Sequence, residues 1–205
     1  MDALFINVML TPEYIENEEK VIRANFYLRF SESAGKRLKV ISEWVNGDPA
    51  CLSVGSGGYE PSVCGATHAL DVSPLAGELL QSIGWRGMFK VGSCAQLPYP
   101  NDRFSKAYCT EVIEHLQSYE DVVRTFEELD RVAVDWLVTT PSRRRGCKNT
   151  DPDHKRDFNE EELRACITPK GYQVFNDGKY FYVVKERGDN DAGCFREIFN
   201  RHFRQ

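Results

Sequence analysis

The 205-residue sequence lacks any run of 18 apolar residues, so it predicts no membrane-spanning helix. No basic region precedes the apolar stretch at its start and no A-x-A pattern follows it, so a secretory signal peptide is not expected. The seven cysteines form no C-x-x-C pair, which favours reduced thiols over disulfides or a zinc site. These absences predict a cytoplasmic protein with no metal site and no membrane partner.

The sequence also lacks an excess of positive charge. Its net charge is -5, so the electrostatics of the whole chain attract neither nucleic acid nor an anionic membrane. The exception is a basic loop over 143–148, which contains Arg143, Arg144, Arg145 and Lys148. A solvated loop is the favoured interpretation, and binding of an anionic substrate such as RNA phosphate is the alternative.

Length and composition suit one globular domain over residues 1–205, with 41% hydrophobic and 28% charged residues. We expect an N-terminal helical cap over 1–48, a core over 50–185 and a C-terminal helix over 186–205. Two helices are predicted between residues 11 and 46, the second marked by Leu38, Ile41 and Val45. The C-terminal helix carries phenylalanines that either pack on the sheet or join a partner chain, so an oligomer is open: Phe195, Phe199 and Phe203.

Beyond residue 50, short apolar runs alternate with helical stretches. The runs lie at 50–54, 68–72, 88–92, 106–110 and 135–140. Such alternation predicts an α/β fold, a doubly wound parallel sheet with helices on both faces. Near the end, Asn176-Asp177-Gly178 separates two further apolar runs and predicts a tight hairpin, so an antiparallel pair should close the sheet.

A glycine turn, VGSGG, follows the first predicted strand, where a doubly wound sheet binds its ligand. Gly55 and Gly57 let the backbone bend sharply beside a ligand. The second strand ends at Asp71, which can accept hydrogen bonds from ribose hydroxyls or, alternatively, cap the next helix in solvent. Glu60 replaces the last glycine of the dinucleotide fingerprint and would repel a pyrophosphate, which disfavours a nicotinamide-dependent oxidoreductase.

The segments VGSGGYE, ALDVSP, VGSCAQLPYPNDRFS and TEVIEHL, in this order, resemble the class I S-adenosylmethionine-dependent methyltransferases, in particular their small-molecule, methyltransferase-11-like branch. The resemblance covers about residues 50–185. It implies a Rossmann-like sheet of seven strands with an antiparallel last strand, and S-adenosyl-L-methionine as cofactor. The cofactor contacts it implies are Gly55, Ser56 and Gly57 at the methionine part, Asp71 and Val72 at the ribose, Ser93, Cys94 and Ala95 at the adenine, and Thr110 and Glu111 near the methyl.

Three positions depart from the family pattern. Ser53 and Ser93 stand where the family often has acids, and Tyr59 stands where it often has a third glycine. The two serines remove negative charge near a cationic cofactor. Weaker cofactor binding, a pocket completed differently and a catalytically silent binding or regulatory subunit are all compatible with these changes.

Three side chains are candidate catalytic residues: Glu111, His115 and His154. Glu111, with Glu114 nearby, could favour the sulfonium of the cofactor, and either histidine could take a proton from a substrate. Alternatively, EVIEHL simply opens a helix with acids in its first turn, and His154 lies on a surface loop. The expected function is methyl transfer to a nucleophilic atom of a small molecule, and RNA methylation or a silent subunit are the alternatives.

Overall fold

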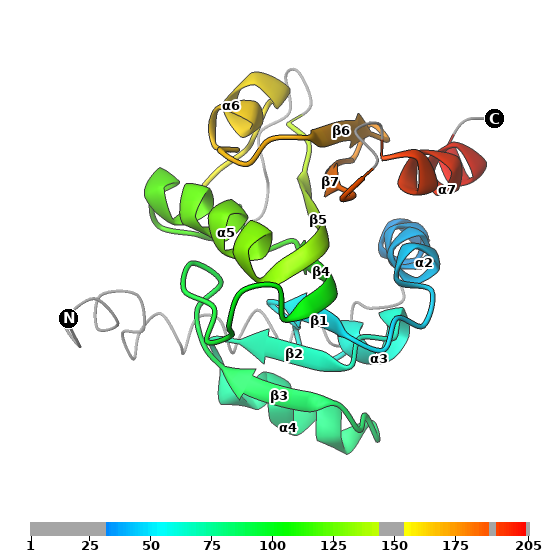
Figure 1. Ribbon diagram of the computed structural model, residues 1–205, viewed down its shortest axis with the longest axis vertical. Coiled ribbons are helices and arrows are strands. Elements are labelled where there is room, and N and C mark those ends of the chain that lie inside the picture. Colours follow the sequence, from blue (N-terminus) through cyan, green and yellow to red (C-terminus); the bar gives the residue numbers. More distant parts are fainter. Residues whose placement is uncertain (1–31, 144–153, 189–191, 204–205) are drawn as a thin grey trace.

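The computed structural model describes residues 32–143, 154–188 and 192–203, and its centre is a seven-stranded sheet (Figure 1). The strand order is β3-β2-β1-β4-β5-β7-β6. The strands are β1 (Cys51–Val54), β2 (His68–Asp71), β3 (Met88–Val91), β4 (Phe104–Thr110), β5 (Ala133–Pro141), β6 (Tyr172–Asn176) and β7 (Tyr180–Lys185). Strands β1 to β5 pair in parallel, and β7 is antiparallel to both β5 and β6. The predicted Rossmann-like sheet with an antiparallel C-terminal hairpin is confirmed.

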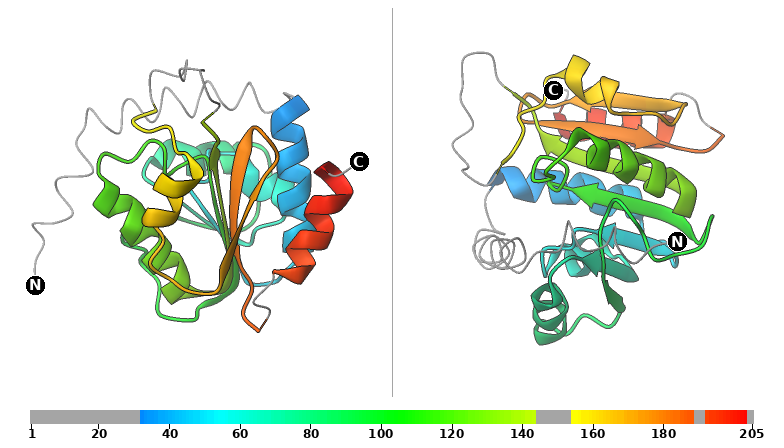
Figure 2. Two further views of the ribbon diagram at one scale, coloured as in Figure 1. Left: turned by 90° about the horizontal axis from the view of Figure 1, so that it is seen from above. Right: turned by 90° about the vertical axis from the view of Figure 1, so that its left-hand side faces the viewer.

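Helices cover both faces of this sheet (Figure 2). They are α2 (Glu32–Val45), α3 (Glu60–Cys64), α4 (Pro74–Ser82), α5 (Tyr119–Val132), α6 (Glu160–Ala165) and α7 (Gly193–Phe203). Helices α5 and α6 lie on one face, and α2 and α7 lie together on the other. The helix predicted before residue 31 lies outside the described residues. Within the described ranges, no helix combines the length and the apolar character needed to cross a membrane.

Each face of the sheet has its own apolar core. On one side, Phe126 of α5 packs at 5.7 Å between ring centroids against Trp136 of β5. On the other side, Tyr182 of β7 contacts Phe195 and Phe199 of α7. The central strands are therefore buried on both faces, which explains why they appear in the sequence as nearly continuous apolar runs. Of the two roles open to α7, the structure shows packing on the sheet.

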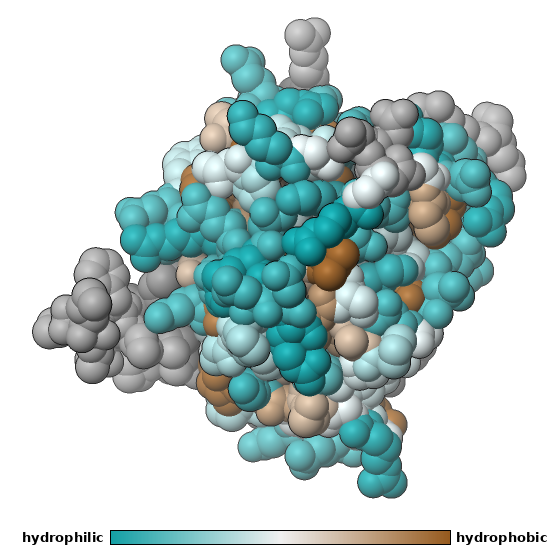
Figure 3. Space-filling view, in the orientation of Figure 1, coloured by the Kyte–Doolittle hydropathy of each residue, from teal (hydrophilic) through white to brown (hydrophobic). Residues whose placement is uncertain are grey.

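The outer surface is mostly hydrophilic on the face drawn in Figure 3, with apolar residues scattered between polar ones. Large apolar side chains that are exposed are spread over several parts of the fold, two of them on β3: Val63, Ile83, Met88, Val91 and Tyr119. Single exposed apolar residues of this kind are normal for a globular domain and indicate no docking surface by themselves.

Local signals explain several element boundaries. Ser118 accepts a hydrogen bond from the backbone amide of Asp121 at 3.1 Å and caps α5, and Asn159 forms the corresponding capping box at α6. Gly178 takes φ 87° in the predicted hairpin turn. The expectation that EVIEHL opens a helix is wrong, because residues 111–118 are irregular and α5 begins only at Tyr119. This segment instead forms a turn at the carboxyl end of β4.

Candidate active site

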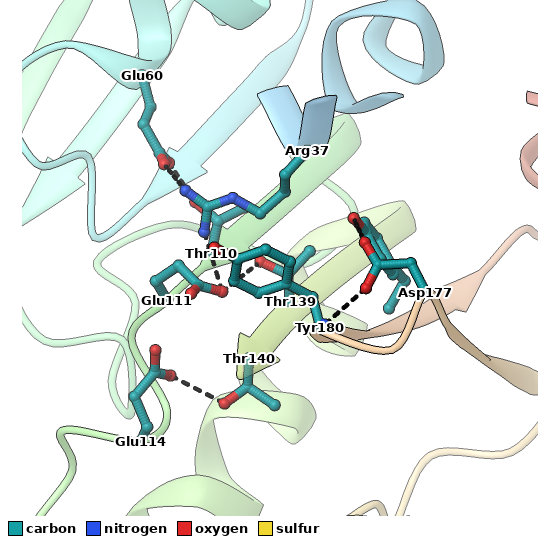
Figure 4. Close-up of polar contacts among 10 residues, drawn as sticks. Arg37, Glu60, Thr110, Glu111, Glu114, Thr139, Thr140, Asp177 and Tyr180 are labelled. Carbon is teal, nitrogen blue, oxygen red and sulfur yellow. Dashed lines mark hydrogen bonds and ion pairs between the residues drawn. The ribbon is translucent and has the colours of Figure 1, made fainter. Parts of the chain in front are cut away.

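The carboxyl ends of β1, β2, β4 and β5 lie at one edge of the sheet because these strands are parallel. The glycine turn follows β1, Asp71 ends β2, and Thr110 ends β4. Figure 4 shows polar side chains gathered beyond β4 and β5. The side chain of Arg37 extends from helix α2 toward them. Residues that are far apart in the sequence thus meet where this type of sheet binds ligands.

The glycine turn is fixed by the neighbouring strand. The backbone amide of Gly55 donates to the carbonyl of Leu70 at 2.8 Å, and that of Gly57 donates to the Asp71 carboxylate at 3.1 Å. Both glycines have positive φ, 71° and 56°. The buried Ser56 hydroxyl has no hydrogen-bond partner among the described residues. A turn with a free polar atom and tight backbone curvature fits a polar ligand lying against it.

Asp71 is the acceptor at the centre of this edge. It is only 5% exposed, which removes the alternative of a solvated aspartate. One carboxylate oxygen accepts from Gly57 and the other from the backbone amide of Ser73 at 3.0 Å, while Ser73 itself caps α4. Burial raises the pKa of Asp71 to about 6, although hydrogen bonds from the backbone of Ser73, Gly57 and Val72 act in the opposite direction.

Substitution of Gly55 and Gly57 by alanine would show how strictly the turn requires glycine at each position. A β-carbon at Gly55 would lie 2.2 Å from Val112, on the segment after β4, whereas one at Gly57 would meet its nearest neighbour, Tyr59, at 3.8 Å. Both positions have positive φ. Gly57→Ala should therefore cost about 1–2 kcal/mol from backbone strain alone, and Gly55→Ala should cost clearly more. Urea unfolding of both variants measures the difference, and equal losses would show that the contact with Val112 is unimportant.

Arg37 is the main residue of this edge that the sequence did not reveal. Its guanidinium lies 3.2 Å from the Glu60 carboxylate and 2.9 Å from that of Glu111 (Figure 4). The arginine is 4% exposed and also lies over the ring of Tyr180 at 5.3 Å. The Thr110 hydroxyl donates to Glu60. One cation therefore joins the acid after the glycine turn to the acid after β4.

The ion pair changes the interpretation of Glu60. Burial raises the pKa of Glu60, while Arg37 and the hydrogen bond from Thr110 lower it. Burial alone would lower the pKa of Arg37, but Glu60 and nearby tyrosines raise it above its ordinary value. Glu60 therefore lies beside a cation, and the repulsion expected from an isolated carboxylate is offset by Arg37.

Glu111, predicted as a catalytic and cofactor-binding residue, is held in a strained backbone conformation with φ 55°. Its backbone amide donates to the carbonyl of Thr139 at 3.0 Å, and its side chain accepts from the Thr139 hydroxyl at 3.0 Å. Arg37 provides the third contact. The end of β5 and helix α2 together fix this carboxylate beyond β4.

The structure brings the two candidate histidines together. The rings of His115 and His154 are 4.8 Å apart between centroids and perpendicular. Glu114, only 1% exposed, accepts a hydrogen bond from the Thr140 hydroxyl at 3.0 Å. The ligand atoms of Glu114, His115 and His154 all lie within 4.8 Å of one another. His154 is therefore not isolated on a surface loop.

The predicted adenine contacts, Ser93, Cys94 and Ala95, differ in which of their groups are available to a ligand. Ser93 accepts a hydrogen bond from the backbone amide of Ala95 at 3.2 Å, whereas the Cys94 side chain is buried in the core and accepts from Thr125 at 3.3 Å. Burial raises the pKa of the Cys94 thiol to about 11. Only the backbone of Cys94 remains for an adenine contact, so the roles of 93–95 and of Val72 stay predictions.

The predicted basic loop is only partly described. Arg143 lies 3.4 Å from the carboxylate of Glu162 in α6. The other basic residues of the loop, Arg144, Arg145 and Lys148, lie outside the described residues. The described part of the loop thus offers a cation that already faces an acid.

Residues 51–135 match the family model of a methyltransferase domain. No curated protein matches the sequence. Among solved structures, a S-adenosylmethionine-dependent methyltransferase of Thermotoga maritima, described as a possible histamine N-methyltransferase, is 14% identical with a TM-score of 0.62 and covers 82% of this chain and 97% of its own. Magnesium protoporphyrin IX methyltransferase of Synechocystis, which contains S-adenosylhomocysteine, is 11% identical with a TM-score of 0.56 over 89% and 99%.

A third similar structure is the cyclase SpnF, which is 14% identical with a TM-score of 0.58 and covers 77% of this chain and 83% of its own. At such identities the structures show a common fold. Together with the match over 51–135, they agree with the predicted family and with its cofactor, S-adenosylmethionine. Residues 51–135 thus match a methyltransferase domain, within a sheet that has the fold of the class I S-adenosylmethionine-dependent methyltransferases.

Proposed function

We propose that the protein transfers a methyl group from S-adenosylmethionine to a nucleophilic atom of a small molecule. The cofactor supplies a methyl already activated on a sulfonium, so the protein mainly has to align the acceptor and exclude water. The observation that carries the proposal is the buried Asp71 carboxylate facing the glycine turn. Asp71 would hold the ribose and the turn 55–57 the methionine part, with Ser56 offering its unpartnered hydroxyl.

The side chains beyond β4 and β5 would face the acceptor. Glu111 is fixed by Arg37 and Thr139 and would place its negative charge toward the sulfonium. His115 and His154 lie on the same side of the sheet edge, on the turn after β4 and on the segment that follows β5. As predicted from the sequence, Glu111 would favour the sulfonium and either histidine would take a proton from the acceptor.

A small molecule is the favoured acceptor for two reasons. The net charge of -5 does not attract nucleic acid, and Arg143 of the basic loop faces Glu162. Two of the similar structures have names that refer to small-molecule acceptors, histamine and magnesium protoporphyrin IX. RNA remains the alternative acceptor.

A catalytically silent role is the second candidate, because Ser53 and Ser93 stand where the family often has acids. The cyclase SpnF has the same fold, so this fold by itself does not fix methyl transfer as the reaction. Binding of the cofactor therefore has to be tested separately from transfer of the methyl.

We expect S-adenosylhomocysteine to raise the melting temperature of the protein, because a ligand selective for the folded state stabilises it. NAD should cause no shift, since the glycine turn lacks the complete dinucleotide fingerprint. Differential scanning fluorimetry with both ligands checks this. A shift with NAD and none with S-adenosylhomocysteine would contradict the cofactor assignment for this chain.

Methyl transfer itself is tested with S-adenosylmethionine labelled on its methyl group. The protein is incubated with the labelled cofactor and, separately, with a small-molecule fraction and an RNA fraction of the same cell extract. Label that moves into the small-molecule fraction supports the proposal. Label in RNA assigns the alternative acceptor, and no transfer by a protein that binds S-adenosylhomocysteine assigns the silent role.

A further inference from the structure

We infer that Glu114, His115 and His154 form a binding site for a divalent first-row transition-metal ion. Cysteine spacing in the sequence predicted no metal site, but these three residues come from two segments that only the fold brings together. Within the described ranges, their carboxylate and imidazole ligand atoms lie within 4.8 Å of one another. This inference concerns metal binding and stands independently of the reaction proposed above.

The distances approach those of a loaded site. Ligand atoms arranged tetrahedrally around one ion at about 2.0–2.2 Å lie about 3.3–3.6 Å apart. At its widest pair the group therefore has to contract by at most about 1.5 Å. Rotation of the His154 side chain, which is partly exposed, can supply this change.

The backbone holds the two segments against each other. The amides of Lys155 and Arg156 donate to the carbonyl of Glu114 at 2.8 and 3.2 Å. The Arg156 guanidinium donates to the carbonyls of Leu116 and Gln117 and lies over the Tyr119 ring at 4.6 Å. The residue preceding Lys155, His154, is thus fixed beside the turn that carries Glu114 and His115.

A second layer orients the carboxylate. Glu114 is almost fully buried and accepts a hydrogen bond from Thr140 at the end of β5 (Figure 4). Partners of this kind fix the direction of a ligating carboxylate and raise the affinity of metal sites. A carboxylate that is buried beside two imidazoles and held by a hydroxyl has the arrangement of a metal ligand.

The donor set indicates the kind of ion. Two imidazoles and one carboxylate suit Mn²⁺, Fe²⁺, Co²⁺ or Zn²⁺, whereas Mg²⁺ and Ca²⁺ prefer oxygen ligands throughout. Three protein ligands leave further coordination positions for oxygen ligands such as water, as in sites that are open to a substrate. We therefore expect Mn²⁺ and Zn²⁺ to bind and Mg²⁺ to bind much more weakly.

Metal binding is tested on the full chain after removal of ions with a chelator. Titration with Mn²⁺, followed by electron paramagnetic resonance of the free ion, should show about one bound ion per chain. His154→Ala and His115→Ala should weaken binding more than 100-fold, and Thr140→Val should weaken it about 10–100-fold. Zn²⁺ should displace Mn²⁺, and a large excess of Mg²⁺ should not.

Two matched variants serve as controls. His202→Ala removes a histidine that faces Glu43 on the outside of α7, and Glu78→Gln removes an exposed carboxylate of α4. Both should bind Mn²⁺ as the unchanged protein does. Binding by the unchanged protein that survives His154→Ala, or no binding of Mn²⁺ or Zn²⁺ at all, overturns the inference. His154→Ala keeps the test valid if a variant at the buried Glu114 fails to fold.

Discussion

Arg37→Met should destabilise the protein by about 3–5 kcal/mol, because it leaves the carboxylate of Glu60 buried without its cation. Glu60 is 4% exposed, lies 3.2 Å from Arg37 and is close enough to Asp71 for that acid to raise its pKa. The hydroxyl of Thr110 still donates to Glu60 in the variant, but a single neutral donor does not replace the guanidinium. The free energy of unfolding in urea measures the loss.

The loss should depend on pH in a known direction. Without Arg37, burial raises the pKa of Glu60 further, so the carboxyl takes up a proton as the pH falls and the cost of the buried charge disappears. The destabilisation should therefore be largest above neutral pH and become smaller toward acidic pH. Adding Glu60→Gln to Arg37→Met should restore part of the stability above neutral pH.

Arg124→Met is the matched control for this prediction. Arg124 pairs with Glu120 at 2.5 Å on the exposed side of α5, and such surface pairs contribute at most about 1 kcal/mol. The variant should therefore unfold nearly as the unchanged protein does. If Arg37→Met is as mild as this control, the pair with Glu60 contributes little to the fold.

The sheet could be predicted from the sequence because its central strands are buried on both faces. Residues such as Tyr108 and Trp136 are fully buried, so β4 and β5 stand out as apolar runs of strand length. The hairpin of β6 and β7 was predicted by its turn residues, Asn176-Asp177-Gly178. In each case the signal is local or has a simple period.

The site was only partly predictable, since its main contacts join distant segments. EVIEHL has the composition of a helix start, yet Arg37 and Thr139 hold Glu111 at positive φ and the chain forms a turn. Arg37 lies within an amphipathic helix and belongs to no motif, so no local pattern indicated it. His115 and His154 were both predicted as catalytic residues, but their direct contact follows from backbone hydrogen bonds to Glu114.

Asp71→Ala should weaken the binding of S-adenosylhomocysteine about 10–150-fold, which corresponds to about 1.5–3 kcal/mol for hydrogen bonds to a charged acceptor. The carboxylate would receive the ribose hydroxyls while the amides of Gly57 and Ser73 hold it in place. The variant should remain folded, because removing a buried carboxylate also removes the cost of burying its charge. Glu78→Ala, at an exposed acid on α4, the helix after Asp71, should bind the ligand normally.

The pH dependence of this binding separates a direct role of Asp71 from a structural one. Burial raises the pKa of Asp71 to about 6, so the free protein holds this carboxyl ionised above pH 6 and protonated below it. The ionised form is the better acceptor for two hydroxyls, and the affinity should therefore be constant above about pH 7 and fall up to about tenfold for each pH unit below 6. Calorimetric titration between pH 5 and pH 8 measures this slope.

The variant Asp71→Ala should lose this pH dependence, because the titrating group is gone. A variant that binds weakly but keeps the same slope would show that another group titrates and that Asp71 only supports the turn.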